Sequence, residues 1–313
     1  MELPNDIVRV NGTLNEAVIL KKETLYKGMN GRFVERFFLS QSKSYIFKPL
    51  TNDGQLGKEV WVHEHVLPLF PAIYPKIITY SISDQTELNW MILEDLGQLS
   101  HNYSEECVLA VVKWMAWWHS LPVEKLGDVP LTGLKPKIEE IVSEVCLKKE
   151  EFLRLLPFLK IDEKLIDDIF AQLTRLNFSD KQVLTHGDLH SGNFAIVGNE
   201  LKILDWEHTH INSPHWDLYH VMDMSHPLFP KKITQEFREK LLDSYLGQVE
   251  YDIDQAAFFK EYYLFASLFS IWMILLIHKD LAANDGKWPV EQLHTQLEET
   301  VSSLNQCASA LLD

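Results

Sequence analysis

The chain has 313 residues, of which 46% are hydrophobic and 24% are charged, so it can bury a large core and exceeds the usual size of one compact domain. Its 45 acidic residues against 29 basic ones give a formal net charge of -16, and such a surface repels nucleic-acid phosphates and anionic membranes. The three cysteines lack CxxC spacing and the N-terminus lacks a signal-peptide pattern, so we expect a cytoplasmic protein with no nucleic-acid or membrane partner.

The first part of the chain is predicted to be rich in strands. Short runs of Val, Ile, Phe and Tyr are separated by segments with turn chemistry, which favours a strand meander. The predicted strands are 18–26, 32–39, 43–48, 76–83 and 88–94. Between the third and fourth strands, a helix is predicted over 54–67, because Leu56, Val60, His63 and Leu67 recur at spacings of three and four.

After Gly97 the pattern changes to long helices, so we expect a boundary near Leu96. The predicted helices are 104–119, 134–156 and 162–176, then several from 216 onward with breaks near Pro227, Pro230, Gly247 and Gly286. A non-helical block over 182–206 separates the two sets. The apolar stretch 262–277 is short for a membrane span and is predicted to be a buried helix.

The strongest chemical signal lies in that non-helical block. Residues 186–193 read His-Gly-Asp-Leu-His-Ser-Gly-Asn and precede an apolar strand over 194–197. A second strand, 201–204, ends in Asp-Trp-Glu at 205–207. Loops at the ends of two short paired strands can direct carboxylate and amide groups toward a common point.

Phosphoryl transfer requires groups of this kind. One carboxylate must orient the attacking hydroxyl and accept its proton, and hard oxygen ligands must hold Mg²⁺ against the phosphates of ATP. Asp188 and Asn193 have the five-residue spacing of the kinase catalytic Asp and metal-binding Asn. Asp205 stands at a strand end shortly afterwards, as the second metal-binding aspartate of kinases does.

These two motifs together resemble the aminoglycoside phosphotransferase and choline kinase family, including the Gly after His186 and the Trp-Glu after Asp205. The resemblance implies an α+β, protein-kinase-like fold with two lobes. The N-terminal nucleotide-binding lobe, 1–95, would hold an antiparallel sheet with one helix, and the larger, mainly helical lobe, 96–313, would hold the catalytic and acceptor sites.

The resemblance also implies a nucleotide site. Lys48, at the end of a Tyr-Ile-Phe-Lys strand, would hold the phosphates, with Glu59 as its partner or else Glu64, which lies roughly 140° further around the helix. The turn glycines Gly28 and Gly31 would let backbone amides approach the phosphates. The backbone of Glu94, Asp95 and Leu96 would bond the adenine edge.

Several nearby residues are expected to be structural. His119 and His186 would pack and support the loop rather than react, and Asp217 would cap its helix or fix the catalytic loop. His190 would lie near the metal, as a contact or as support.

We therefore expect an ATP- and Mg²⁺-dependent small-molecule kinase, with Asp188 as the catalytic base and Asn193 and Asp205 as metal ligands. The acidic composition favours an amine-bearing acceptor alcohol such as an aminoglycoside, choline, ethanolamine or an amino sugar, although net charge can also serve solubility alone. A neutral sugar, a hydroxy-amino acid and a nucleoside-like alcohol stay open. The alternatives are a catalytically silent ligand-binding protein with this fold and, less favoured, a protein kinase or a metal-dependent hydrolase.

Overall fold

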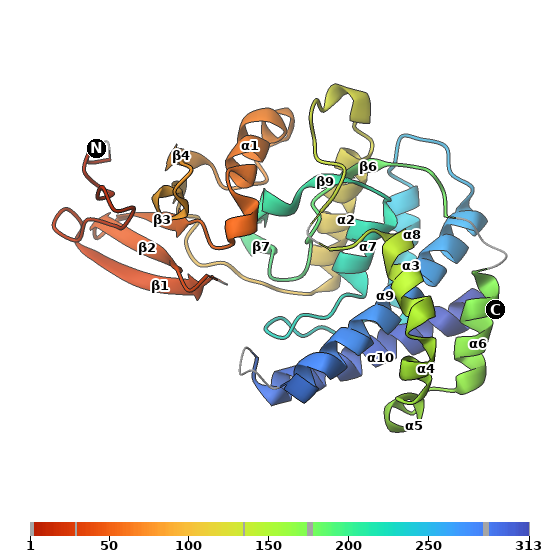
Figure 1. Cartoon of the computed structure of the whole chain (residues 1–313). Coiled ribbons are helices and arrows are strands. Elements are labelled where there is room, and N and C mark those ends of the chain that lie inside the picture. The colour runs from red at the N-terminus through yellow and green to blue at the C-terminus, as the bar shows by residue number, and fades with distance from the viewer. Residues whose placement is uncertain (1–2, 29, 134, 174–177, 284–287, 313) are drawn as a thin grey trace. The chain divides into compact units, whose positions relative to one another are not determined.

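The computed structural model describes residues 3–28, 30–133, 135–173, 178–283 and 288–312. They form two compact units (Figure 1). The first comprises Met1–Ser100 and Ile196–His208, and the second comprises His101–Ala195 and Thr209–Asp313. The chain therefore leaves the second unit within one strand, contributes a short segment to the first unit, and then returns.

The first unit is built on a five-stranded sheet in the order β1-β2-β3-β5-β4, in which all neighbours are antiparallel. The strands are β1 Lys21–Lys27, β2 Phe33–Ser40, β3 Lys43–Pro49, β4 Ile77–Ser81 and β5 Trp90–Glu94. All five were predicted, with ends that differ by up to a few residues. The first unit's core includes Phe37, Phe47 and Ile92 from one face of the sheet, packed against Ile7 and Leu14.

The helix expected over 54–67 is broken into three short pieces. They are the turns η1 Asp53–Gln55 and η2 Leu67–Leu69, and between them the helix α1 Lys58–His65. Gly57 has a left-handed φ of 69° immediately before α1, and Pro68 lies in η2, so a continuous helix cannot form. The predicted apolar face was partly wrong, because Leu56 is 39% exposed whereas Glu59 is 5% exposed.

The returning segment of the first unit is a hairpin with a tight turn after it. Strand β7 Phe194–Val197 pairs with β8 Glu200–Ile203, and the turn η5 Trp206–His208 follows. The Ile203 N–H donates to the Ile73 carbonyl at 2.6 Å, and the buried Trp206 ring meets the Phe70 ring edge-on at 5.2 Å. These contacts fix the residues that follow β8 beside α1.

The second unit is mainly helical, as predicted. Its helices are α2 Glu105–His119, α3 Ile138–Leu147, α4 Lys149–Leu153, α5 Leu156–Leu159, α6 Glu163–Gln172, α7 His215–Met222, α8 Gln235–Leu246, α9 Gln255–Ala283 and α10 Val290–Leu312. A strand pair, β6 Val183–Thr185 with β9 His210–Asn212, flanks the block at 186–193, and neither strand was predicted. The expectations at 134, 174–176 and 286 fall outside the described residues.

The single helix expected over 134–156 was wrong, because α3, α4 and α5 cover this region. Lys148 departs from helical backbone with ψ of 13°, and Leu155 separates α5 from the helix before it, with Pro157 in its first turn. A sequence of good helix formers favours one long helix locally, and here the packing of the unit decides otherwise.

Helix α9 forms much of the core of the second unit. By length and composition it is apolar enough to cross a membrane, and 67% of its most apolar window is buried inside the fold. Phe265 and Phe269 pack against Trp216 and Tyr219 of α7. The stretch 262–277 is thus largely buried in the fold, as predicted.

Candidate active site

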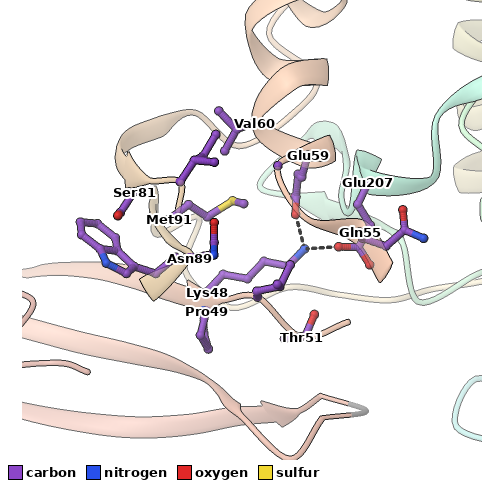
Figure 2. A pocket seen from close by; sticks show the side chains of 14 residues that line it. Lys48, Pro49, Thr51, Gln55, Glu59, Val60, Ser81, Asn89, Met91 and Glu207 are labelled. Atoms are coloured by element: carbon purple, nitrogen blue, oxygen red, sulfur yellow. Dashed lines mark hydrogen bonds and ion pairs between the residues drawn. The ribbon is translucent and has the colours of Figure 1, made fainter. Parts of the chain in front are cut away.

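Lys48 lies at the centre of a charged cluster within the first unit. Its ammonium contacts Glu59 Oε2 at 2.5 Å and lies 3.9 Å from Glu207 Oε2 (Figure 2). It also donates to Asp205 Oδ1. Glu64, the other glutamate considered, instead accepts a hydrogen bond from the Tyr80 hydroxyl at 2.5 Å. Strand β3, helix α1 and the segment after β8 thus each bring one part of the cluster.

This cluster carries an excess of negative charge. One ammonium faces three carboxylates, which leaves a formal charge of -2. Burial alone would lower the pKa of Lys48, but the carboxylates of Asp205, Glu59 and Glu207 raise it well above its usual value. Burial is the main cause that raises the pKa of Glu59 to about 7, and the charges of Asp205 and Glu207 add to it. Lys48 is therefore a cation in this site, and the remaining negative charge of the cluster favours the binding of a further cation.

The three carboxylates could also hold a metal ion. One oxygen from each of Glu59, Asp205 and Glu207 lies within 4.8 Å of the others. Asp205 has a left-handed φ of 63°, a conformation that only a few per cent of residues other than glycine adopt. Such backbone strain is concentrated at functional sites, where it directs a side chain. Sequence reasoning matched Glu207 to the Trp-Glu motif but gave it no role here.

A small pocket opens beside this cluster within the first unit. Lys48, Glu59 and Glu207 line its charged side, and Val60 and Met91 are among its apolar residues (Figure 2). Met91 stands opposite Lys48 in the pairing of β3 with β5. The pocket thus lies at the start of β5, whereas the predicted adenine-binding residues lie at and just beyond its end.

The predicted glycine turn is folded onto the segment that follows β3. The N–H groups of Gly28, Asn30 and Gly31 donate to the carbonyls of Arg32, Thr51 and Gly28. Asn30 also donates from its side chain to the Leu50 carbonyl at 2.7 Å and to Asp53 at 2.9 Å. Binding a phosphate through these amides would require the turn to open; residue 29 lies outside the described chain.

The predicted hinge residues are tied into the sheet. The Glu94 N–H donates to the Lys76 carbonyl, and the Glu94 carboxylate accepts from the Lys76 N–H, each at 2.9 Å. Asp95 accepts hydrogen bonds from Ser44, Gly97 and Arg36. Burial would raise the pKa of Asp95, but these donors outweigh it and lower the pKa. The Asp95 side chain therefore fixes the chain after β5, and Leu96 follows it.

In the second unit, residues 186–193 form a compact loop that brings Asp188 and Asn193 together. The Asn193 side-chain amide donates to the Asp188 carbonyl at 2.8 Å, and the Asn193 N–H donates to the His190 carbonyl. Gly187 has a φ of 87°, which favours glycine there. Gly192 lies so close to Phe229 that an added Cβ would come within 2.4 Å of its ring.

Basic side chains lie close to the Asp188 carboxylate, and Lys135 and His190 are the two nearest. Lys135 Nζ lies 2.6 Å from Asp188 Oδ1, and His190 Nε2 lies 3.7 Å from Oδ2. The Gly192 N–H donates to His190 Nδ1, so the proton of a neutral His190 sits on Nε2, the nitrogen nearer Asp188. Sequence reasoning missed Lys135, whose only signal was its position in the lobe expected to hold the acceptor site.

Asp217 fixes this loop through hydrogen bonds to its backbone, as predicted. Its carboxylate accepts from the backbone N–H groups of His186 at 2.7 Å and Gly187 at 3.1 Å. His119, which is buried, lies with Nε2 3.3 Å from the same carboxylate. Both residues thus support the loop from a fully buried position.

Solved structures with similar folds are small-molecule phosphotransferases. The chain resembles the GDP complex of wild-type aminoglycoside 2'-phosphotransferase-IIIa, with 19% identity, a TM-score of 0.58, and coverage of 92% of this chain and 94% of that one. Choline kinase LicA from Streptococcus pneumoniae is 18% identical with a TM-score of 0.52, and the match covers 91% of this chain and 93% of that one. Spectinomycin phosphotransferase APH(9)-Ia in complex with ADP and spectinomycin is 17% identical with a TM-score of 0.55, and the match covers 92% of this chain and 94% of that one. The fold is therefore that of the kinase-like phosphotransferases.

Comparison of the sequence with family profiles assigns the chain to a protein family. The profile of the phosphotransferase enzyme family matches residues 75–259, which is more than half of the chain, and the protein belongs to that family. A comparison with curated protein sequences gave no match. The family resemblance read from the two motifs is thereby confirmed.

Proposed function

We propose that this protein transfers the γ-phosphoryl group of ATP to a hydroxyl group of a small molecule, with Mg²⁺ as cofactor. The observation that carries the proposal is the Lys48 ammonium held between Glu59 and Asp205, because this set of groups comes from three separate segments of the first unit. Kinases use such a lysine–glutamate pair to hold ATP phosphates and such an aspartate to hold the metal. Solved complexes of the similar proteins contain GDP or ADP, which supports a nucleotide site.

In this proposal, Lys48 binds the α- and β-phosphates while Glu59 keeps its ammonium oriented. The adenine edge bonds to the backbone near Asp95 and Leu96, since the Glu94 N–H already bonds Lys76. Gly28 and Gly31 let the turn between β1 and β2 open toward the phosphates. Asp188 orients the acceptor hydroxyl and takes its proton as the oxygen–phosphorus bond forms.

The residues present fit a divalent cation. The cluster around Lys48 has a formal charge of -2, and its carboxylate oxygens are the hard ligands that Mg²⁺ prefers. Asp205 would hold the ion, with the side-chain oxygen of Asn193 as the second protein ligand expected from the motif. When bound, Mg²⁺ would neutralise charge on the β- and γ-phosphate oxygens.

For the acceptor, we propose an amine-bearing alcohol or sugar. The net charge of -16 supports a cationic ligand, and the similar structures include complexes with kanamycin and spectinomycin and a choline kinase. The ammonium of Lys135 already lies against Asp188. The amine of an acceptor would therefore sit away from its reacting hydroxyl. We further propose a cytoplasmic location, in keeping with the sequence.

The first test is calorimetric binding of a non-hydrolysable ATP analogue to the intact chain, with and without Mg²⁺. We expect binding that requires Mg²⁺ and that weakens at least about tenfold in Asp205→Asn, since one charged ligand is lost. Asp84→Asn is a matched control on the same unit, because Asp84 is an exposed carboxylate that lies outside both the Lys48 cluster and the glycine turn. Absence of analogue binding in the wild type would favour the silent ligand-binding alternative.

The second test separates binding from chemistry. Asp188→Ala should reduce ADP release to background, measured over a panel of amino alcohols and sugars, and leave Mg-ATP binding within about threefold, because Asp188 acts on the acceptor. Equal loss of binding and turnover in this variant would refute the role given to Asp188.

A further inference from the structure

Lys135 is the cation nearest to the proposed catalytic base among the described residues. It lies between α2 and α3, and its side chain is 24% exposed while that of Asp188 is 23% exposed. Its Nζ lies 2.6 Å from Asp188 Oδ1 and 3.1 Å from His220 Nε2. His220 Nε2 is in turn 3.9 Å from the same Asp188 oxygen, so the three groups form one cluster within the second unit.

The hydrogen bonds of His220 fix which of its nitrogens accepts. Its Nδ1 lies 2.7 Å from the Trp216 carbonyl, and a carbonyl can only accept, so Nδ1 carries the proton. His220 is fully buried, and burial, followed by the charge of Lys135, lowers its pKa well below the usual value. Neutral His220 therefore presents the lone pair of Nε2 to the Lys135 ammonium.

The Lys135 ammonium is thus held by two acceptors, a carboxylate and an imidazole. An ammonium has three N–H donors, and these contacts use two of them. No other hydrogen bond of Lys135 occurs within the described ranges of the chain. An exposed ion pair formed only for solubility would not need a buried, neutral histidine as a second acceptor.

The role proposed for Asp188 places the Lys135 ammonium close to the phosphoryl group that is transferred. The acceptor oxygen that Asp188 orients is the atom that becomes bonded to phosphorus. A cation in hydrogen-bond contact with that carboxylate is therefore next to the oxygens of the phosphoryl group in transit. Charge on those oxygens is what cationic groups stabilise during phosphoryl transfer.

We propose that Lys135 is a further catalytic residue whose third N–H donates to the phosphoryl group during transfer, with His220 as the residue that positions it. The proposal rests on the proposed function. In the step, the acceptor oxygen bonds to phosphorus, the bond from phosphorus to the β-phosphate bridging oxygen breaks, and the hydroxyl proton moves to Asp188. ADP leaves, and Lys135 keeps its proton throughout.

The test uses Lys135→Met, with Lys137→Met as the matched control, because Lys137 is an exposed lysine of the same segment. ATP hydrolysis by the intact protein with Mg²⁺, with water as the acceptor, is followed by ADP release. We expect kcat to fall about 100-fold in Lys135→Met, the usual effect of removing one such donor, with the KM for ATP within about threefold. The kcat of Lys137→Met should match that of the wild type. The kcat of Lys135→Arg, which keeps a cation, should lie between those of the wild type and Lys135→Met.

A transition-state mimic gives a readout that a purely structural role would not move. Calorimetry compares the affinity for Mg-ADP with that for Mg-ADP and aluminium fluoride, which imitates the phosphoryl group in transit. The wild type should bind the fluoride complex more tightly, and Lys135→Met should lose at least about tenfold of that preference while binding Mg-ADP normally. His220→Leu should lose part of the preference for the fluoride complex. His220→Gln, whose amide oxygen can accept a hydrogen bond from Lys135, should lose less of that preference.

The outcomes separate the two proposals. A wild type that turns over ATP, with Lys135→Met equal to it in kcat and in preference for aluminium fluoride, would overturn the role of Lys135 alone. A wild type with neither turnover nor binding of Mg-ADP would overturn the proposed function and the role of Lys135 together.

Discussion

Replacing Asp217 with asparagine should destabilise the second unit and slow catalysis together. Asp217 is fully buried and accepts from the N–H groups of His186 and Gly187, which precede Asp188 in the loop. It also faces His119 Nε2 at 3.3 Å. Asparagine keeps the shape of the side chain but has one acceptor oxygen and an NH₂ group in place of a second oxygen.

The size of the effect follows from the charge and from the lost acceptor. Burial raises the pKa of Asp217, but the hydrogen bond and charge of His119, then the influence of His186, outweigh it and lower the pKa from 3.8 to about 2. A carboxyl with a depressed folded-state pKa contributes stability that is complete above pH 4 and is lost as the pH falls toward 2. A pKa lowered to about 2 corresponds to roughly 2 kcal/mol of stability at neutral pH. One buried N–H left without an acceptor adds about 1–3 kcal/mol.

We therefore expect Asp217→Asn to lose about 3–5 kcal/mol of unfolding free energy at pH 7, measured by urea unfolding. ADP release should fall at least about tenfold under conditions where the variant is folded, because the loop that carries Asp188 loses its anchor. Asp243→Asn is the control, since exposed Asp243 bonds Gln255 at the surface and should change stability by less than about 0.5 kcal/mol. A loss within 1 kcal/mol of that control would refute the reasoning.

Two other substitutions test buried charges in the second unit. Asp223→Asn should cost about 3–5 kcal/mol in urea unfolding, because it removes the anionic partner of the fully buried Arg238 guanidinium, which lies 2.7 Å from Asp223. A loss below 1 kcal/mol would show that other groups compensate the buried charge. Burial lowers the pKa of His226 to about 4 from 6.5, so the fold disfavours the imidazolium and stability falls as the pH drops from 6.5 toward 4. His226→Gln should flatten that limb of the pH–stability curve by up to about 3 kcal/mol, and an unchanged slope would contradict the assignment.

The parts that could be predicted from the sequence are those fixed by local pattern. Short runs of Val, Ile, Phe and Tyr between turn segments predicted the five strands of the first unit, and the end of one of these strands placed Lys48. The motif at 186–193, within a predicted non-helical block, placed Asp188 and Asn193 in one loop. In each case the residues that define the feature are neighbours along the chain, so their spacing contains the geometry.

The parts that could not be predicted depend on distant segments. The return of Ile196–His208 to the first unit rests on backbone contacts with Ile73 and on Trp206 meeting Phe70, and no spacing encodes these. Lys135 lies 53 residues before Asp188 and meets it only because the fold brings the segment between α2 and α3 back to the loop. Helix breaks at Lys148 and strand β9 are likewise consequences of packing.

The two proposed half-sites differ in charge, and this difference bears on their roles. In the first unit, Glu59, Asp205 and Glu207 outnumber Lys48, so the cluster retains a formal charge of -2. In the second unit, the Asp188 carboxylate is balanced by the Lys135 ammonium. An unbalanced carboxylate cluster attracts a divalent cation and its phosphate ligands, whereas a balanced pair presents little net charge to a neutral hydroxyl group. Under the proposed function, charge neutralisation of ATP would therefore belong to the first unit and orientation of the acceptor to the second.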